Sequence, residues 1–138
     1  MRLVKQQHAM GCGVACVAMI LGETYEDACR HFPGVDFETR GIVYLQVDSL
    51  LMDRGYAVRR MYRQTHQYID RPLWPPTPFA AQHVCQVVIG QNCHFVVMDS
   101  GGIVLDPLKD LVGSLFDYEK VNQVMGLYLI SAAERGGE

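Results

Sequence analysis

The sequence lacks the features by which nucleic-acid-binding and membrane-spanning proteins are usually recognised. Its 138 residues include 12 basic and 15 acidic side chains, for a formal net charge of −3, whereas a nucleic-acid-binding domain needs a basic patch or stripe. Its longest apolar run, residues 14–21, is far shorter than the roughly 20 residues that cross a bilayer. We therefore expect no nucleic acid among its partners and no direct insertion into a membrane.

A secretory signal peptide and a closed disulfide framework are also missing. Gln6, Gln7 and His8 interrupt the apolar stretch near the amino terminus, and a signal peptide needs that stretch unbroken. The five cysteines are an odd number and include no Cys-x-x-Cys pair. These absences predict a cytoplasmic protein with reduced thiols, which leaves packing, metal binding or catalysis as their uses.

Hydrophobic periodicity divides the chain into a helical first half and a β-rich second half. Apolar residues at helical spacing dominate the first half, and short β-branched runs dominate the second. The predicted helices cover residues 13–21, 24–31 and 42–51, the predicted strands residues 56–62, 80–89, 94–98, 102–105 and 125–131, a further short helix residues 108–116, and a proline-rich loop residues 71–78.

This order of elements predicts one α+β domain whose strands are mostly adjacent and antiparallel. Hydrophobic residues make up 49% of the chain, which is enough for a single core. We expect residues 1–138 to form that domain, with a helical half over residues 1–55, a β-rich half over residues 56–133 and a frayed tail over residues 134–138.

Cys12 lies at the start of the first predicted helix, between Gly11 and Gly13. At that position it meets the positive end of the helix dipole and unpaired backbone N–H groups, which favour the thiolate. The flanking glycines leave room for a substrate carbonyl. Cys16, one turn deeper, has neither advantage and is interpreted as a buried hydrophobic residue. The pattern indicates a nucleophile at Cys12, with an inert cysteine at a helix start as the alternative.

Two glutamines precede this cysteine. Gln6 comes six residues before Cys12, where its amide could donate a hydrogen bond into an oxyanion hole beside the backbone N–H of Cys12. Gln7 is the competing candidate for the oxyanion donor. For either glutamine, the alternative is a solvated side chain with no role in the site.

A β-hairpin is predicted where two apolar runs, residues 94–98 and 102–105, flank a turn. If the loop has three residues centred on Ser100, His94 lies directly opposite Asp106; a two-residue loop, Ser100-Gly101, makes the two side chains diagonal neighbours. Either register brings the imidazole and the carboxylate to the same end of the hairpin within reach of one another. Such a pair can remove a proton from a cysteine, and a structural histidine capped by a turn aspartate is the alternative.

Taken together, these residues resemble those of papain-like cysteine peptidases. The closer resemblance is to the bacteriocin-processing peptidase domain family, which trims double-glycine leader peptides. It is carried by Gln6, the run Cys-Gly-Val-Ala-Cys at residues 12–16, the run His-Phe-Val-Val at residues 94–97, and Asp106-Pro107, and it covers nearly the whole chain. One position departs from the family, whose members usually have an acidic residue just before the nucleophile, where this chain has Gly11.

The resemblance implies a papain-like fold and a cysteine endopeptidase that needs no cofactor or metal. It implies Cys12 as the nucleophile, His94 as general base and acid, Asp106 as the orienting carboxylate and Gln6 as the oxyanion donor. The implied substrate is a peptide with a double-glycine leader, cleaved through a thioester. The implied partner is an ABC exporter, on a separate chain or as the remainder of a longer protein.

Three other interpretations stay open on the sequence alone. His83, Cys85, Cys93 and His94 lie on adjacent predicted strands and could form a zinc site. A catalytically silent relative could keep the groove and bind a peptide. The same residues could also catalyse another acyl transfer, such as amide hydrolysis or peptide ligation, because fold and triad chemistry are shared among these activities.

Overall fold

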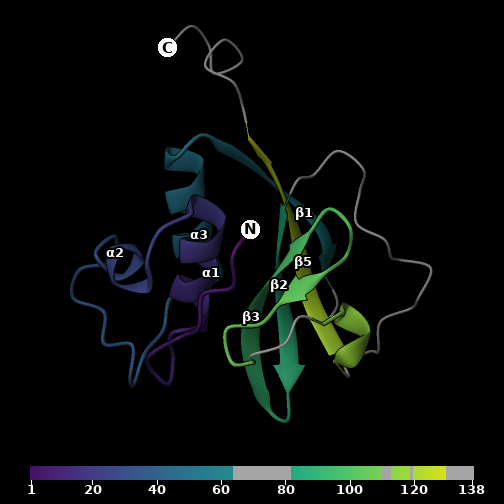
Figure 1. Cartoon of the computed structure of the whole chain (residues 1–138), viewed down its shortest axis with the longest axis horizontal. Helices are drawn as coiled ribbons and strands as arrows, with labels where there is room; N and C mark the ends of the chain where they lie inside the picture. Colours follow the sequence, from purple (N-terminus) through teal and green to yellow (C-terminus); the bar gives the residue numbers. More distant parts are fainter. Residues whose placement is uncertain (64–81, 110–112, 119, 130–138) are drawn as a thin grey trace, which may run out of the picture.

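The computed structural model describes residues 1–63, 82–109, 113–118 and 120–129. Three helices lie on one side of a five-stranded sheet, and the amino-terminal segment runs between them and the sheet (Figure 1). The predicted proline-rich loop at residues 71–78 and the tail at residues 134–138 fall outside the described residues. No helix in the described ranges is long and apolar enough to cross a membrane.

The central helix α1, Cys12–Leu21, agrees with its prediction within one residue. Every residue from Gly13 to Ile20 is buried, because the sequence there is apolar on all faces of the helix. Gly22 ends it in the left-handed conformation, with φ of 69°, and donates its backbone N–H to the carbonyl of Ala18. The helix therefore lies in the middle of the core, with its amino-terminal end beside β3.

Two further helices complete the helical half. In α2, Tyr25–Cys29, the Thr24 hydroxyl accepts a hydrogen bond from the backbone N–H of Asp27 at 3.1 Å and so caps the helix. The helix ends two residues earlier than expected. Helix α3, Tyr44–Asp53, begins and ends two residues later than the predicted periodic run.

The sheet is entirely antiparallel, with the strand order β1-β5-β2-β3-β4. Strands β2 and β3 form a long hairpin that pairs through eight residues on each side. The strands are β1 Tyr56–Arg63, β2 Gln82–Ile89, β3 Asn92–Asp99, β4 Val104–Leu105 and β5 Lys120–Leu129.

The predicted helix at residues 108–116 is wrong in its described part. Gly113 pairs with Val104 through two backbone hydrogen bonds of 2.8 and 2.9 Å, so this segment adds a short bridge beside β4. Only a 3₁₀ turn, Leu115–Asp117, is helical. Glycine has little intrinsic preference for a helix, and the edge of β4 offers it backbone partners instead.

Strand β5 begins at Lys120, five residues before the predicted start. Its pairing with β2 shifts between Val121 and Gln123, which leaves Asn122 as an extra residue opposite Gln86 and Val87. This β-bulge breaks the alternation of buried and exposed residues. The period of two that identifies a strand is therefore absent from the sequence at this point.

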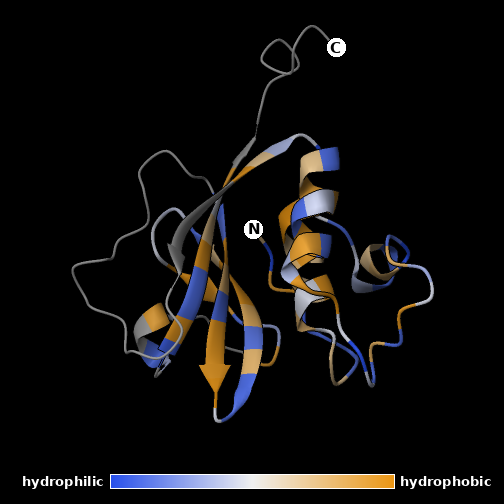
Figure 2. Cartoon of the chain, turned by 180° about the vertical axis from the view of Figure 1, so that it is seen from behind, coloured by the Kyte–Doolittle hydropathy of each residue, from blue (hydrophilic) through white to orange (hydrophobic). Residues whose placement is uncertain are grey.

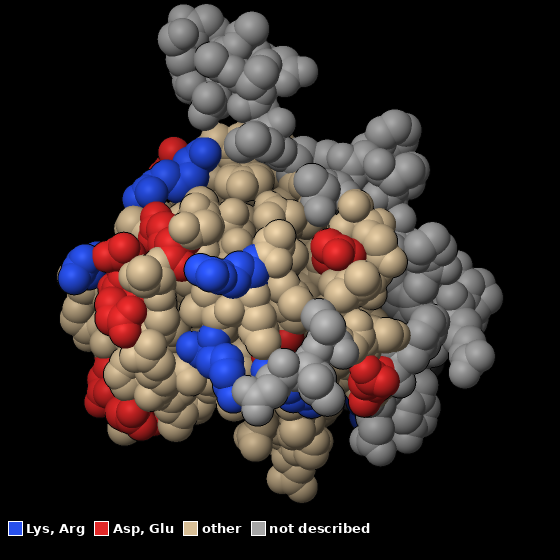
Figure 3. All heavy atoms as spheres, in the orientation of Figure 1, with Lys and Arg blue, Asp and Glu red and all other residues tan. Residues whose placement is uncertain are grey.

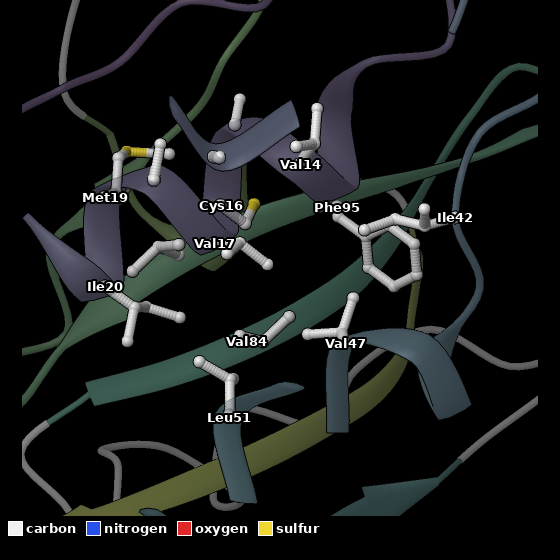
Figure 4. Close-up of a cluster of buried hydrophobic side chains, with 14 of the residues drawn as sticks. Val14, Cys16, Val17, Met19, Ile20, Ile42, Val47, Leu51, Val84 and Phe95 are labelled. Carbon is white, nitrogen blue, oxygen red and sulfur yellow. The ribbon is translucent and has the colours of Figure 1, made fainter. Parts of the chain in front are cut away.

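The core has one hydrophobic layer on each face of the sheet. Helices α1 and α3 turn their apolar sides to the sheet (Figure 2), and their side chains interlock with those of β2 and β3 (Figure 4). Charged side chains of both signs are interspersed on the surface shown in Figure 3. The layer between helices and sheet includes Val14, Val17, Val47, Leu51, Val84, Phe95 and Val97, and the opposite layer includes Cys85, Val87, Val96, Met98, Val104, Leu115, Val121 and Val124.

We expect Leu51→Ala to lower the free energy of unfolding by about 2 to 5 kcal/mol, because a fully buried side chain would leave a cavity. Leu45→Ala in the same helix is the control. Its side chain is 71% exposed, so the change should stay within about 0.5 kcal/mol. Urea denaturation of both variants measures the difference, and equal losses would contradict the assigned packing of α3.

Candidate active site

Three segments that are separated in the sequence meet at one place: the amino-terminal end of α1, the start of β3 and the turn after β4. Cys12 is the first residue of α1, and Gly11 before it provides no side-chain cap. A Cβ atom on Gly13 would lie 2.8 Å from Ile42 and 3.3 Å from Phe95. A side chain at position 13 would therefore push the helix tip away from β3, and the glycine allows the close approach that brings Cys12 to the strand.

His94 links the thiol to the carboxylate. Its Nε2 atom lies 2.6 Å from Oδ1 of Asp106, and the side chains are 6% and 2% exposed. Because that nitrogen is occupied by the carboxylate, Nδ1 is the one left for Cys12, whose thiol lies close enough to the imidazole for each group to shift the pKa of the other. The structure thus brings Cys12, His94 and Asp106 together.

Asp106 is held by two further donors. The backbone N–H of Leu108 donates to Oδ1 at 2.8 Å, and the Tyr118 hydroxyl donates to Oδ2. The ammonium of Lys109 lies 4.8 Å from the centre of the Tyr118 ring, which favours this placement of the ring through a cation–π contact. The carboxylate is therefore fixed on both oxygens before any substrate binds.

The proximity of His94 and Asp106 agrees with the sequence prediction, but the predicted hairpin register is wrong. The turn contains three residues, and its centre is Gly101, one residue later than assumed. The cause is Asp99, whose Oδ1 accepts hydrogen bonds from the backbone N–H groups of Gly101 at 2.8 Å and Ile103 at 3.0 Å. An aspartate that binds the backbone two residues on is a common way to fix a turn.

This register places Val97 opposite Leu105, and β4 ends there. If the ladder continued, Asp106 would lie opposite Val96 and diagonal to His94. A shift of two residues keeps each side chain on its original face of the sheet, because side chains along a strand alternate between the two faces with a period of two residues. The carboxylate consequently still points to the face that carries the imidazole, and reaches it from the turn.

The electrostatics of the site favour an ion pair. Burial tends to raise the pKa of Cys12, but the hydrogen bond and charge of His94 and the backbone N–H groups of Phe95 and Gly13 outweigh it and lower that pKa. Burial tends to lower the pKa of His94, but the bonds and charges of Asp106 and Cys12 raise it to about 9. Burial would also raise the pKa of Asp106, which its three hydrogen bonds lower. The shifts of the three pKa values therefore favour the thiolate, the imidazolium and the carboxylate.

Gln6 lies in the turn before Cys12, and its backbone N–H donates to the carbonyl of Pro107, directly after Asp106. Its Nε2 donates to the carbonyls of His8 at 3.0 Å and Ala9 at 3.1 Å, so both amide hydrogens are used within the turn in this conformation. Gln7 is exposed and directs its side chain to Glu26. The oxyanion role of Gln6 therefore stays a prediction.

Cys16 and the histidine of the zinc alternative that lies on β2, His83, do not join the site. Cys16 is fully buried, and burial raises its pKa well above the ordinary value. His83 pairs with Met98 whereas His94 pairs with Val87, which separates the two histidines by about 13 Å along the sheet. Within the described ranges no group of three or more His, Cys, Asp or Glu could hold a metal ion.

Sequence reasoning missed Tyr118. It follows Asp106 by twelve residues in an irregular segment, and neither periodicity nor spacing connects a lone tyrosine there with the carboxylate. The only available signal was the acidic residue itself, since a buried carboxylate needs donors for both oxygens.

Comparison with known proteins identifies the fold. No protein-family model and no curated protein matches this sequence. Among solved structures, the peptidase domain of Streptococcus ComA, a bi-functional ABC transporter involved in a quorum sensing pathway, matches with a TM-score of 0.60 and 19% identity. The match covers 93% of this chain and 98% of that one. The fold is that of a papain-like peptidase domain. At the level of the fold, the resemblance inferred from the sequence is confirmed.

We expect iodoacetamide to modify Cys12 in preference to the buried Cys16 and Cys85, and at lower pH than an ordinary thiol, because His94 stabilises the thiolate. His94→Ala removes the hydrogen bond and the charge that oppose burial most strongly, and so raises the pKa of Cys12. A rise of about one unit reduces the rate at neutral pH about tenfold. Mass spectrometry across a pH series measures both rates, with the exposed Cys93 as internal control. An unchanged profile for Cys12 would contradict the ion pair.

Tyr118→Phe should cost about 1 to 2 kcal/mol of unfolding free energy at pH 7, because a partly buried carboxylate loses a donor. The low pKa of Asp106 stabilises the fold above its unfolded value near 3.8, and that contribution is lost as pH falls through the folded pKa. The cost of the substitution should therefore shrink with acidification. Denaturation at several pH values measures this, with Tyr56→Phe on β1 as the control; a pH-independent cost would oppose the assigned bond.

Proposed function

We propose that this protein is a cysteine peptidase that cleaves its substrate through a thioester acyl-enzyme. The observation that carries the proposal is the buried His94, whose Nε2 lies 2.6 Å from Oδ1 of Asp106 and whose imidazole lies close enough to Cys12 to lower the pKa of the thiol. A histidine in contact with both a thiol and a carboxylate is the arrangement that activates a nucleophile in peptidases on unrelated folds. The fold also supports this chemistry, because the solved structure that it matches is a peptidase domain.

In the proposed mechanism, the Cys12 thiolate attacks the carbonyl carbon of the scissile peptide bond and forms a tetrahedral intermediate. The His94 imidazolium then gives its proton to the leaving amine as the C–N bond breaks, and a thioester remains. Neutral His94 next takes a proton from water, which attacks the thioester and releases the acid. Asp106 stays ionised throughout and stabilises the imidazolium.

The negative oxygen of each tetrahedral intermediate needs donors. The backbone N–H of Cys12 is the first of the helix and lacks a side-chain cap, so it supports this role. Gln6 can supply a second donor if one amide hydrogen leaves a carbonyl of its own turn, an exchange that costs about 0.5 to 1.5 kcal/mol. Catalytic hydrogen bonds often form only in the substrate complex.

We infer that the substrate is a peptide with a double-glycine leader, that cleavage follows the two glycines, and that it takes place in the cytoplasm. The sequence resemblance supports this substrate, and the ComA domain supports a connection with export, because that domain belongs to an ABC transporter. An ABC exporter is accordingly the proposed partner, on its own chain or as the rest of a longer protein.

The test is cleavage of a synthetic peptide that carries a Gly-Gly-terminated leader, followed by chromatography and mass spectrometry. Cys12→Ala should abolish cleavage, and His94→Ala should reduce kcat/KM by at least about a thousandfold. Asp106→Asn should be less severe than His94→Ala. A matched peptide with Ala-Ala in place of Gly-Gly should be cut much more slowly.

Each other result assigns a different function. Cleavage that survives Cys12→Ala would overturn the nucleophile. Binding of the leader without cleavage would indicate a silent peptide-binding domain. Transfer of the acyl group to an added amine, in place of water, would indicate a ligase with the same acyl-enzyme.

A further inference from the structure

The space beside Gly11 is filled by a hydroxyl group from another helix. A Cβ atom built on Gly11 would lie 2.0 Å from the Tyr25 hydroxyl oxygen and 3.1 Å from the ring carbon that bears it. The backbone angles of Gly11, φ −92° and ψ 11°, are open to any residue. Position 11 therefore excludes side chains for lack of space alone, and this is the position at which the chain departs from the family that it resembles.

Tyr25, the first residue of α2, is only 3% exposed. Its hydroxyl lies 3.0 Å from Nδ1 of His8, and the two rings stack with centroids 5.6 Å apart and planes at 29°. Burial raises the pKa of Tyr25 to about 12, against the smaller opposing effect of the backbone N–H groups of Gln7 and His8. At neutral pH the hydroxyl is therefore protonated and can donate to His8.

His8 is the centre of the turn formed by residues 6–11, which we call the oxyanion turn. The His8 carbonyl accepts hydrogen bonds from the Gln6 amide at 3.0 Å and from the Gly11 backbone N–H at 3.1 Å. The backbone N–H of Gln6 donates to Pro107 at 3.1 Å, directly after the catalytic aspartate. The turn thus connects the carboxylate end of the site with the helix tip, and Tyr25 contacts it in the middle.

We propose that Tyr25 is a positioning residue for catalysis: its hydroxyl holds His8, and through it the oxyanion turn, in the space that Gly11 leaves open. The turn carries the amide of Gln6 and leads directly into the backbone N–H of Cys12, so a shift of the turn moves both donors relative to the thiol. This inference rests on the proposed peptidase function, because it concerns the same site. Tyr25 does not contact the reacting atoms in this assignment.

Tyr25→Phe removes the hydroxyl and keeps the ring. Donors that shift by a fraction of an ångström stabilise the transition state less than before, while the surface that binds the peptide is unchanged. We expect kcat for the leader peptide to fall about tenfold with KM within about twofold. Tyr56→Phe, at a half-buried tyrosine on β1, is the control and should leave both constants unchanged. Equal kcat values for the two variants would overturn the proposal.

A double-mutant cycle tests the contact itself. Gly11→Ala should collide with the Tyr25 hydroxyl and displace the helix tip from His94, which lowers kcat and the alkylation rate of Cys12 at neutral pH by at least about tenfold. In Gly11→Ala/Tyr25→Phe the hydroxyl is gone, so the alkylation rate of Cys12 should recover at least severalfold relative to Gly11→Ala alone, whereas kcat should rise no further than the value of Tyr25→Phe. Additive losses would overturn the contact.

Alkylation of Cys12 needs no peptide, so the two proposals can fail separately. If the parent chain does not cleave the peptide but alkylation shows the recovery, the peptidase function is wrong and the contact between Tyr25 and the turn stands. If cleavage depends on Cys12 but Tyr25→Phe matches Tyr56→Phe, the positioning role is wrong and the function stands. Thermal unfolding of each variant confirms that the protein compared is folded.

Discussion

The close contact between the amino-terminal tip of α1 and the start of β3 is the constraint on which the rest of the site depends. It exists because Gly13 has no side chain to hold the helix away from Ile42 and Phe95. The contact brings the first residue of a fully buried helix, Cys12, to the imidazole of His94. Without it the chain would still have a helix and a sheet, but the thiol and the imidazole would belong to separate layers.

The charges at this contact stabilise one another. A buried imidazolium or carboxylate alone would be costly. Here the carboxylate of Asp106 has three donors, from His94, Tyr118 and the backbone of Leu108. The same carboxylate and the thiolate keep the imidazole protonated. The network therefore favours the thiolate of Cys12 at a position where desolvation alone would disfavour it, and it links the hydrogen-bonding state of one residue to that of the others.

Local patterns predicted the helical half well and the β-rich half less well. Helix α1 is apolar throughout and ends at a glycine with positive φ, and both signals are local. The start of strand β5 was predicted five residues too late, because a bulge at Asn122 interrupts the alternation of buried and exposed residues. The segment around Gly113 was predicted as helix, although it pairs with Val104. Both errors arose where pairing with another strand, and not the local pattern, determines the conformation.

The sequence by itself determined which residue types take part: a cysteine at a helix start, a histidine and an aspartate at one end of a hairpin, and the faces on which the last two lie. Only the tertiary structure decided the register of that hairpin, the hydrogen bond between Tyr118 and the Asp106 carboxylate, and the filling of the space beside Gly11 by Tyr25. The physical reason is that side-chain alternation is a property of the strand itself. In contrast, contacts made by lone tyrosines between elements depend on how whole layers pack, and no period in the sequence records that packing.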